Sequence, residues 1–213
     1  MTSGLQLIQF AKWPRPGRVK TRLATALGEE GALNAHIRLT LTVMERLVQS
    51  GYPVTLAWDR AVAEPPAEAA SILQAMAVSG VGQSIQQGVD LGERMTRALA
   101  AGLRGADIAM VIGSDCPSVD ADYIEQARSA LAQSDVVFGP SDDGGYVLIA
   151  ARRTRPEMLQ GVAWGSEQAL DQSMAAVRNA GLRVATLGPR WDVDEPADWH
   201  RFLAEFGQSR TDG

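Results

Sequence analysis

The chain is poor in cysteine, histidine and lysine, and it contains no long apolar segment. One cysteine and two histidines occur among its 213 residues, which excludes an intrachain disulfide and a multi-cysteine metal site. The longest apolar runs, such as Ile108–Ile112 and Tyr146–Ala151, are far shorter than the roughly 18–20 residues of a membrane-spanning helix. No basic segment followed by an apolar run opens the sequence, so we expect a cytoplasmic protein without membrane attachment.

The overall composition is that of an ordinary globular protein with an acidic balance. Hydrophobic residues make up 46% and charged residues 21% of the chain, which excludes disorder and coiled coil as descriptions of the whole sequence. The length predicts a single domain covering residues 1–213. A net charge of −5 and a pI near 5.1 argue against nucleic-acid binding as the main activity.

The two lysines stand out because they lie in the same short segment. Of the 20 basic residues, only Lys12 and Lys20 are lysine, and both fall within Phe10–Ala24. A compact ammonium group suits a phosphate that is contacted as a point charge better than a rigid guanidinium fork does. A basic loop exposed to solvent is the alternative interpretation.

Apolar strand-like segments alternate with helical patterns along the chain. This rhythm predicts an α/β fold with a mostly parallel, Rossmann-like sheet and helices on both faces. We expect Leu5–Ala11 and Ile108–Ile112 to be adjacent central strands, and Ser118 to cap the helix Ala121–Ala132. The predicted strands are Leu5–Ala11, Pro53–Trp58, Ile108–Ile112, Asp135–Gly139, Tyr146–Ala151 and Arg183–Leu187. The predicted helices are Thr21–Ser50, broken at Gly28, and Ala67–Met76, Glu93–Leu103, Ala121–Ala132, Ser166–Ala180 and Pro196–Phe206.

Polar residues gather in four loops that follow predicted strands. In open α/β sheets, ligands bind beyond the carboxyl ends of the strands. The four loops are Lys12–Arg22, Gly113–Pro117, Pro140–Tyr146 and Trp191–Asp194, and together they carry five acids and a basic cluster. The sequence therefore predicts a polar site at this edge of the sheet.

The first of these loops matches neither common phosphate-binding motif. Lys20-Thr21 precedes a helix, but Val19 stands where a P-loop needs its second glycine, and the Rossmann glycine pattern is missing as well. What remains is a loop that leads into a helix N-terminus with Lys20 and Arg22 close to its first turn. Backbone N–H groups, the helix dipole and two cations make such a place suitable for a phosphate or diphosphate.

The acids of the other loops are candidate metal ligands. Asp115 directly follows a predicted apolar strand, while Asp192 and Asp194 are two residues apart and would lie on the same side of the chain if it is extended there. A few carboxylate oxygens suit Mg²⁺ or Mn²⁺, with water and substrate phosphate completing the coordination. The segment Asp142–Gly145 is either a tight turn or a place where a ligand approaches the backbone. Taken singly, Asp115 is more typical of a helix cap or a turn, whereas the pair Asp192 and Asp194 is equally compatible with a solvated turn before the last helix.

Five strings occur together in an order typical of a known family: FAKWPRPGRVKTRL, QQGVDLGERM, GSDCPSV, GPSDDGGYVLI and WDVDEPADW. Over nearly the whole chain the sequence resembles the bacterial GT-A-type transferases called radical-SAM/selenodomain-associated transferase 1, also described as glycosyltransferases linked to arsenosugar biosynthesis. It is more distantly similar to the nucleotidyltransferases that make molybdenum-cofactor and deazaflavin-cofactor precursors. The resemblance implies the nucleotide-diphospho-sugar transferase fold.

The resemblance also implies roles for individual residues. The family usually has Thr where this chain has Glu195, and Trp-Ser-Thr where it has Trp164-Gly165-Ser166, which affects the acceptor side at most. The nucleotide would contact Ala11, Lys12, Pro16, Gly17, Lys20, Arg22 and Ser114. The acceptor would contact Asp142, Asp143, Gly144, Gly145, Tyr146 and Trp164. Asp115, Asp192 and Asp194 would hold Mg²⁺ or Mn²⁺, and Lys20, Arg22, Asp115 and Asp143 would be catalytic.

Three functions fit these residues. The first is a metal-dependent glycosyl transfer from a nucleotide sugar to a small acceptor, in which Lys20 and Arg22 stabilise the leaving group. The second is nucleotidyl transfer with release of pyrophosphate, and the third is a catalytically silent nucleotide-binding protein. The sequence names neither the nucleotide, the acceptor nor the oligomeric state, and fold alone does not choose among these functions.

Overall fold

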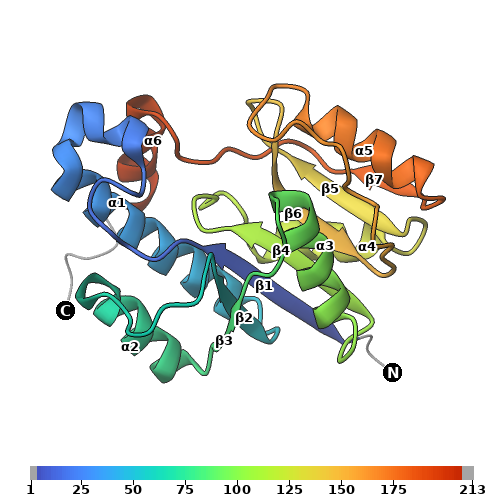
Figure 1. Ribbon diagram of the computed structural model, residues 1–213, viewed down its shortest axis with the longest axis horizontal. Helices are drawn as coiled ribbons and strands as arrows, with labels where there is room; N and C mark the ends of the chain where they lie inside the picture. Colours follow the sequence, from blue (N-terminus) through green and yellow to red (C-terminus); the bar gives the residue numbers. More distant parts are fainter. Residues whose placement is uncertain (1–3, 208–213) are drawn as a thin grey trace.

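The computed structural model describes residues 4–207 and contains a seven-stranded sheet in the order β3-β2-β1-β4-β6-β5-β7, with helices on both faces (Figure 1). The strands are β1 (Leu5–Ala11), β2 (Val54–Trp58), β3 (Gly82–Ile85), β4 (Ile108–Gly113), β5 (Val136–Pro140), β6 (Tyr146–Ala151) and β7 (Val184–Thr186). The helices are α1 (Thr21–Gln49), α2 (Ala70–Ser79), α3 (Leu91–Gly102), α4 (Ala121–Ala130), α5 (Ala169–Asn179) and α6 (Pro196–Phe206), and a short 3-10 turn, η1 (Ala67–Ala69), precedes α2.

The sheet is mostly parallel, which confirms the predicted fold class. β1 pairs in parallel with β2 on one side and with β4 on the other, so the expected adjacency of these central strands is confirmed. Only β6 runs against its neighbours, β4 and β5. The chain enters β6 from β5 through a short turn and not through a crossover helix, and such a connection can only produce an antiparallel pair.

Three local predictions need correction. The strand β3 is missing from the prediction because its four residues, Gly82–Ile85, are all exposed at the sheet edge and show no apolar alternation. Ser118 does not cap α4. The carboxylate of Asp120 accepts the capping hydrogen bond from Tyr123 N at 2.8 Å, while the Ser118 hydroxyl donates to the carbonyl of Trp191. The helix α5 begins at Ala169, three residues later than expected.

Alternating side chains of the central strands build two apolar layers. Leu7 of β1 and Met110 of β4 belong to the layer that packs against α1, α2 and α4, whereas Ile8 and Val111 belong to the layer against α3 and α5. A third cluster joins α6 to the N-terminal part of α1 beyond the sheet. Within α1, Gly28 has φ 70° and ψ 172° and breaks the helix as predicted. No helix in residues 4–207 is long and apolar enough to cross a membrane.

The connection from β7 to α6 runs back across the carboxyl ends of the strands, as the red connection in Figure 1 shows. Backbone hydrogen bonds of 2.9 Å fix it at two points, from Arg190 N to Pro140 O and from Val193 N to Asp115 O. The buried Tyr123 hydroxyl donates to Gly188 O at 2.7 Å. These bonds place the acids of the connection beside the loop that follows β4.

Replacing Tyr123 by Phe tests this attachment. The change leaves the buried ring in place and removes the partner of Gly188 O, so we expect the free energy of unfolding to fall by about 1–2 kcal/mol. The measurement is urea unfolding of both proteins. Tyr52→Phe is the control, because the Tyr52 hydroxyl bonds to Glu125 in a more exposed position and its loss should cost less than about 1 kcal/mol. Equal losses in the two variants would contradict a special role for Tyr123.

Candidate active site

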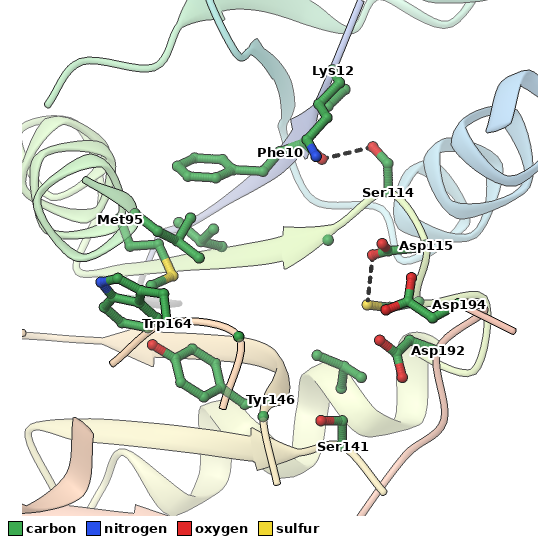
Figure 2. Close-up of a pocket in the computed structure, with 18 of the residues that line it drawn as sticks. Phe10, Lys12, Met95, Ser114, Asp115, Ser141, Tyr146, Trp164, Asp192 and Asp194 are labelled. Atoms are coloured by element: carbon green, nitrogen blue, oxygen red, sulfur yellow. Dashed lines mark hydrogen bonds between the residues drawn. The ribbon is translucent and has the colours of Figure 1, made fainter. Parts of the chain in front are cut away.

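A cavity of about 500 Å³ opens at the carboxyl ends of the central strands. Residues from all four polar loops line it, so the fold brings together segments that lie far apart in the sequence. Figure 2 shows two unlike sides, with Asp115, Asp192 and Asp194 on one and the rings of Phe10, Tyr146 and Trp164 on the other. The cavity lies beyond the end of β1, where the strand order reverses, since β2 lies on one side of β1 and β4 on the other. Ligands usually bind at this position in such sheets.

Lys20 is the centre of the acidic side. Its side chain is only 8% exposed, and its ammonium donates to Asp115 Oδ2 at 2.9 Å, to Asp194 Oδ1 at 2.9 Å and to Val193 O. Among the described residues other than glycine it alone has a positive φ, 46°, a conformation that L-residues adopt at a cost. All three N–H donors of the ammonium therefore have partners inside the protein.

The two carboxylates and the ammonium stabilise one another's charge. Burial disfavours the charged form of Lys20, but Asp115 and Asp194 outweigh it and raise the pKa of the lysine above its ordinary value. Burial acts against Asp115 as well, yet the Lys20 ammonium lowers the pKa of this carboxyl to about 2. Both groups are consequently charged throughout the physiological pH range.

Two further carboxylates, those of Asp143 and Asp192, form a group with Asp194. Asp143, Asp192 and Asp194 each offer an oxygen within 4.8 Å of the others. Asp115 lies outside this group, so the cluster in the structure differs from the predicted set of Asp115, Asp192 and Asp194. Burial, and then the charges of Asp115, Asp143 and Asp194, raise the pKa of Asp192 to about 7. Several crowded carboxylate oxygens with a shortage of positive charge fit a hard divalent cation such as Mg²⁺ or Mn²⁺.

Asp143 and Arg22 lie at the mouth of the acidic side. Asp143 Oδ1 accepts hydrogen bonds from the Ser141 hydroxyl and from Gly145 N, the latter at 3.1 Å, so the turn after β5 fixes the direction of the carboxylate. The guanidinium of Arg22 lies 3.7 Å from Asp194 and 3.5 Å from Glu195, and its side chain is 64% exposed. Arg22 is thus held near the acids while its donors stay accessible to a ligand.

The opposite side of the cavity is apolar and aromatic. Tyr146 and Trp164 meet edge to face with ring centroids 6.3 Å apart, and Met95 lies beside them in Figure 2. A Cβ on Gly92 would come within 2.7 Å of the Trp164 ring, so the small residue allows α3 and the ring to approach closely. This side offers a ligand a fixed apolar surface rather than charge.

Most of the residues predicted for the site line the cavity. Pro16 and Gly17 do not, because they belong to an exposed turn ahead of α1. Asp142 is exposed outside the lining, and Gly144 is packed so tightly that a Cβ there would lie 2.1 Å from Glu167 O. The predicted residues that line the cavity are Ala11, Lys12, Lys20, Arg22, Ser114, Asp115, Asp143, Gly145, Tyr146, Trp164, Asp192 and Asp194.

Several lining residues were not predicted. Asp59 directly follows β2, so the rule that singled out the other loops could have found it. Gln86 follows β3, and it was missed together with that strand. Met95 comes from the first turns of α3, and His36 from the middle of α1. Burial lowers the pKa of His36, whose Nε2 contacts Lys12 O at 2.9 Å, which makes it a neutral structural residue.

Comparison with known proteins places the chain in a family. Residues 51–166, just over half of the sequence, match the model described as "Uncharacterized protein conserved in bacteria (DUF2064)". The chain belongs to the DUF2064 family. A curated relative of this DUF2064 protein is phosphoenolpyruvate guanylyltransferase from Sphaerobacter thermophilus, 29% identical over 129 residues, which are 60% of this chain and 62% of the relative. The match therefore spans less than two thirds of that enzyme's length.

Solved structures agree with the fold. A protein from Desulfovibrio desulfuricans G20, provisionally described as a nucleotide-diphospho-sugar transferase, superposes with a TM-score of 0.81 at 27% identity, covering 99% of the DUF2064 chain and 90% of that protein. The manganese complex of Rv0371c from Mycobacterium tuberculosis H37Rv gives a TM-score of 0.51 at 16% identity, covering 95% and 99%. The DUF2064 chain thus has the α/β fold of nucleotide-diphospho-sugar transferases.

The raised pKa of Asp192 predicts how stability depends on pH when divalent cations are removed by chelation. The unfolded chain releases this proton near the ordinary value of 3.8, whereas the folded protein keeps it up to about pH 7. Between these values the folded state holds the extra proton, so the contribution of Asp192 to the free energy of unfolding decreases as pH rises. In Asp192→Asn this decrease is absent. We therefore expect the free energy of unfolding of the variant, relative to that of the parent, to increase by on the order of 2–4 kcal/mol as the pH is raised from 5 to 8.

The measurement is urea unfolding of both proteins in EDTA at pH 5 and pH 8. Comparing the variant with its parent isolates Asp192, because the lowered pKa of the buried His36 gives the opposite dependence in both proteins. Asp171→Asn, at an exposed position in the first turn of α5, is the matched control and should show no such gain. A stability difference for Asp192→Asn that stays constant with pH would contradict the raised pKa.

Proposed function

We propose that this protein is a metal-dependent transferase that uses a nucleotide-activated donor, and that it transfers a glycosyl group from a nucleotide sugar to a small acceptor. The observation that carries the proposal is the acidic side of the cavity, where four carboxylates and one buried ammonium meet at the carboxyl ends of the strands. A protein that only binds a partner has no need to concentrate mutually repelling carboxylates in this way. The fold shared with the Desulfovibrio protein supports the same class.

The carboxylates fit a divalent cation, and we assign Asp143, Asp192 and Asp194 as the residues that would hold Mg²⁺ or Mn²⁺. When bound, the ion neutralises the charge of a donor diphosphate and of the leaving group. Asp115 lies outside this group of three, and its carboxylate pairs with the Lys20 ammonium. We therefore assign Asp115 to the support of the site, through the ammonium that it shares with Asp194.

The remaining polar groups have complementary roles in this proposal. Lys20 and Ser114 hold the loops after β1 and β4 in place, and the accessible guanidinium of Arg22 contacts the donor phosphates. Asp143, oriented by Ser141 and Gly145 N, brings its cation-binding carboxylate to the acceptor side of the cavity. The rings of Tyr146 and Trp164 form a surface for the body of the acceptor. In the same proposal residues 1–213 form one domain.

Nucleotidyl transfer is the second candidate, and the curated relative favours it because that enzyme is named a guanylyltransferase. The two reactions break different bonds. In glycosyl transfer the leaving group is a nucleoside diphosphate. In nucleotidyl transfer an acceptor oxygen attacks the α-phosphate of a nucleoside triphosphate, and pyrophosphate leaves.

The reaction products distinguish the two candidates. The purified protein is incubated with MgCl₂ and either nucleoside triphosphates or nucleotide sugars, each with a mixture of small hydroxyl and phosphate acceptors, and the products are separated by ion-exchange chromatography. Glycosyl transfer predicts nucleoside diphosphate from a nucleotide sugar, at a level that depends on the acceptor. Pyrophosphate from a triphosphate would instead support nucleotidyl transfer, and neither product with any donor would contradict the proposal.

Asp194→Asn tests the metal site without relying on turnover. The change keeps the shape of the side chain and removes one charged ligand, so we expect Mn²⁺ affinity, measured by calorimetry, to fall at least about tenfold. Turnover should fall on the order of 10²–10³-fold. Asp122→Asn on the exposed side of α4 is the control and should bind Mn²⁺ like the parent. Unchanged Mn²⁺ affinity of a folded Asp194→Asn protein would rule out this residue as a ligand.

A further inference from the structure

Two residues at the ends of neighbouring strands form a corner of the cavity that does not include the acidic cluster. Asp59 follows β2 and Gln86 follows β3, and both line the cavity. Gln86 N donates to Trp58 O at 2.9 Å, and Asp59 N donates to Ala11 O at 2.8 Å. These backbone bonds continue the parallel pairing, so the two side chains leave the sheet edge next to each other.

The amide of Gln86 can present only its oxygen to a ligand. Its Nε2 donates to Ala57 O at 2.8 Å and to Ala11 O at 3.4 Å. The opposite orientation would bring the amide oxygen against two carbonyl oxygens, which repel it. Two backbone carbonyls therefore fix the direction of this side chain, and Oε1 is the atom that remains as an acceptor.

Asp59 adds a carboxylate that can only accept. Its side chain is 16% exposed, and Oδ1 accepts from Trp13 N at 3.0 Å while Oδ2 pairs with Arg60 at 3.2 Å. Each carboxylate oxygen has a second lone pair for a ligand. Asp59 is held in this direction before any ligand arrives, which favours selective binding.

Two stacked tryptophan rings support this corner and make it rigid. The indole rings of Trp13 and Trp58 stack with their centroids 3.8 Å apart and an interplanar angle of 7°. Trp13 Nε1 also donates to Arg60 O at 2.9 Å. The corner thus combines fixed side-chain acceptors, and no side-chain donor of Gln86 or Asp59 is left for a ligand.

We propose that Asp59 and Gln86 read the base of the donor nucleotide and select guanine. This inference rests on the proposed function, since it assumes that the cavity binds a nucleotide whose phosphates lie toward the acids. Guanine presents two adjacent donors, N1–H and the N2 amino group, and these match a carboxylate and a neighbouring amide oxygen. Asp59 accepts from this edge, and Gln86 Oε1 accepts the remaining amino hydrogen.

The other bases fit this corner less well. Adenine and cytosine place an acceptor nitrogen beside their amino group, and that nitrogen would face the carboxylate. Uracil has one N–H between two carbonyl oxygens, both of which would be repelled. Selection follows because a wrong base leaves buried acceptors of the protein unpaired or opposed. The aromatic side of the cavity, with Tyr146 and Trp164, has no comparable fixed set of acceptors.

The test is calorimetric binding of nucleoside diphosphates to the full chain in MgCl₂. We expect GDP to bind at least about tenfold more tightly than ADP, CDP or UDP, and more tightly than IDP, which lacks the N2 amino group. Asp59→Asn keeps an oxygen for Trp13 N but replaces the other acceptor by an amide donor. It should weaken GDP about 10–100-fold, bring GDP and IDP to nearly equal affinity, and strengthen binding of xanthosine diphosphate, whose O2 accepts.

Asp171→Asn on α5 is the matched control and should keep the GDP preference of the parent. UDP or CDP binding to the parent as tightly as GDP would overturn the inference without any variant, as would an unchanged ratio of GDP to IDP in a folded Asp59→Asn protein. In both cases nucleotide binding persists and the proposed function stands. If none of the diphosphates binds to the parent, the proposed function fails and this inference fails with it.

Discussion

The ion pairs of the Lys20 ammonium with Asp115 and Asp194 are the interaction on which the site depends. They join the loop after β1, the loop after β4 and the connection from β7 to α6, which are separated by 95 and 174 residues along the chain. Without the ammonium, two carboxylates would face each other in a half-buried place, and removal of one partner of such a group is strongly destabilising. The strained backbone of Lys20 is consistent with this role, because packing and charge hold it in place.

The fold gives the two sides of the cavity different physical tasks. The acidic side crowds charge that a cation relieves, and the raised pKa of Asp192 reflects this crowding. The aromatic side depends on close approach, since Gly92 lets Trp164 lie against α3 and Gly144 lets the turn after β5 pack on Glu167. A side chain at either glycine would push the segment that carries Trp164 away from the cavity. The arrangement of the acidic side therefore depends on charge, and that of the aromatic side depends on the lack of a side chain at Gly92 and Gly144.

The corner at Asp59 and Gln86 shows how an edge strand contributes to function. β3 is short and fully exposed, and it buries no apolar side chain. Its parallel pairing with β2 nevertheless places Gln86 beside Asp59. The carbonyl oxygens of Ala11 in β1 and Ala57 in β2 then accept hydrogen bonds from the Gln86 amide and fix its orientation. Positioning here comes from backbone hydrogen bonds rather than from the core.

The apolar run Ile108–Ile112 by itself predicts a central strand, because a strand covered on both faces is apolar throughout. Gln6 and Gln9 interrupt Leu5–Ala11, so its central place beside β4 is a weaker prediction from the sequence. With the strands assigned, the rule for parallel sheets also predicts that the loops bearing Lys20, Asp115 and Asp194 share one edge. The local sequence does not predict that Lys20 forms ion pairs with Asp115 and Asp194. Only the tertiary structure decides that Lys20 donates to Asp115, Asp194 and Val193 O. It also decides that Asp143 rather than Asp115 joins the cluster, and that the exposed segment Gly82–Ile85 is a strand. In each case the deciding partner is distant in the sequence, and its position follows from the packing of the whole sheet.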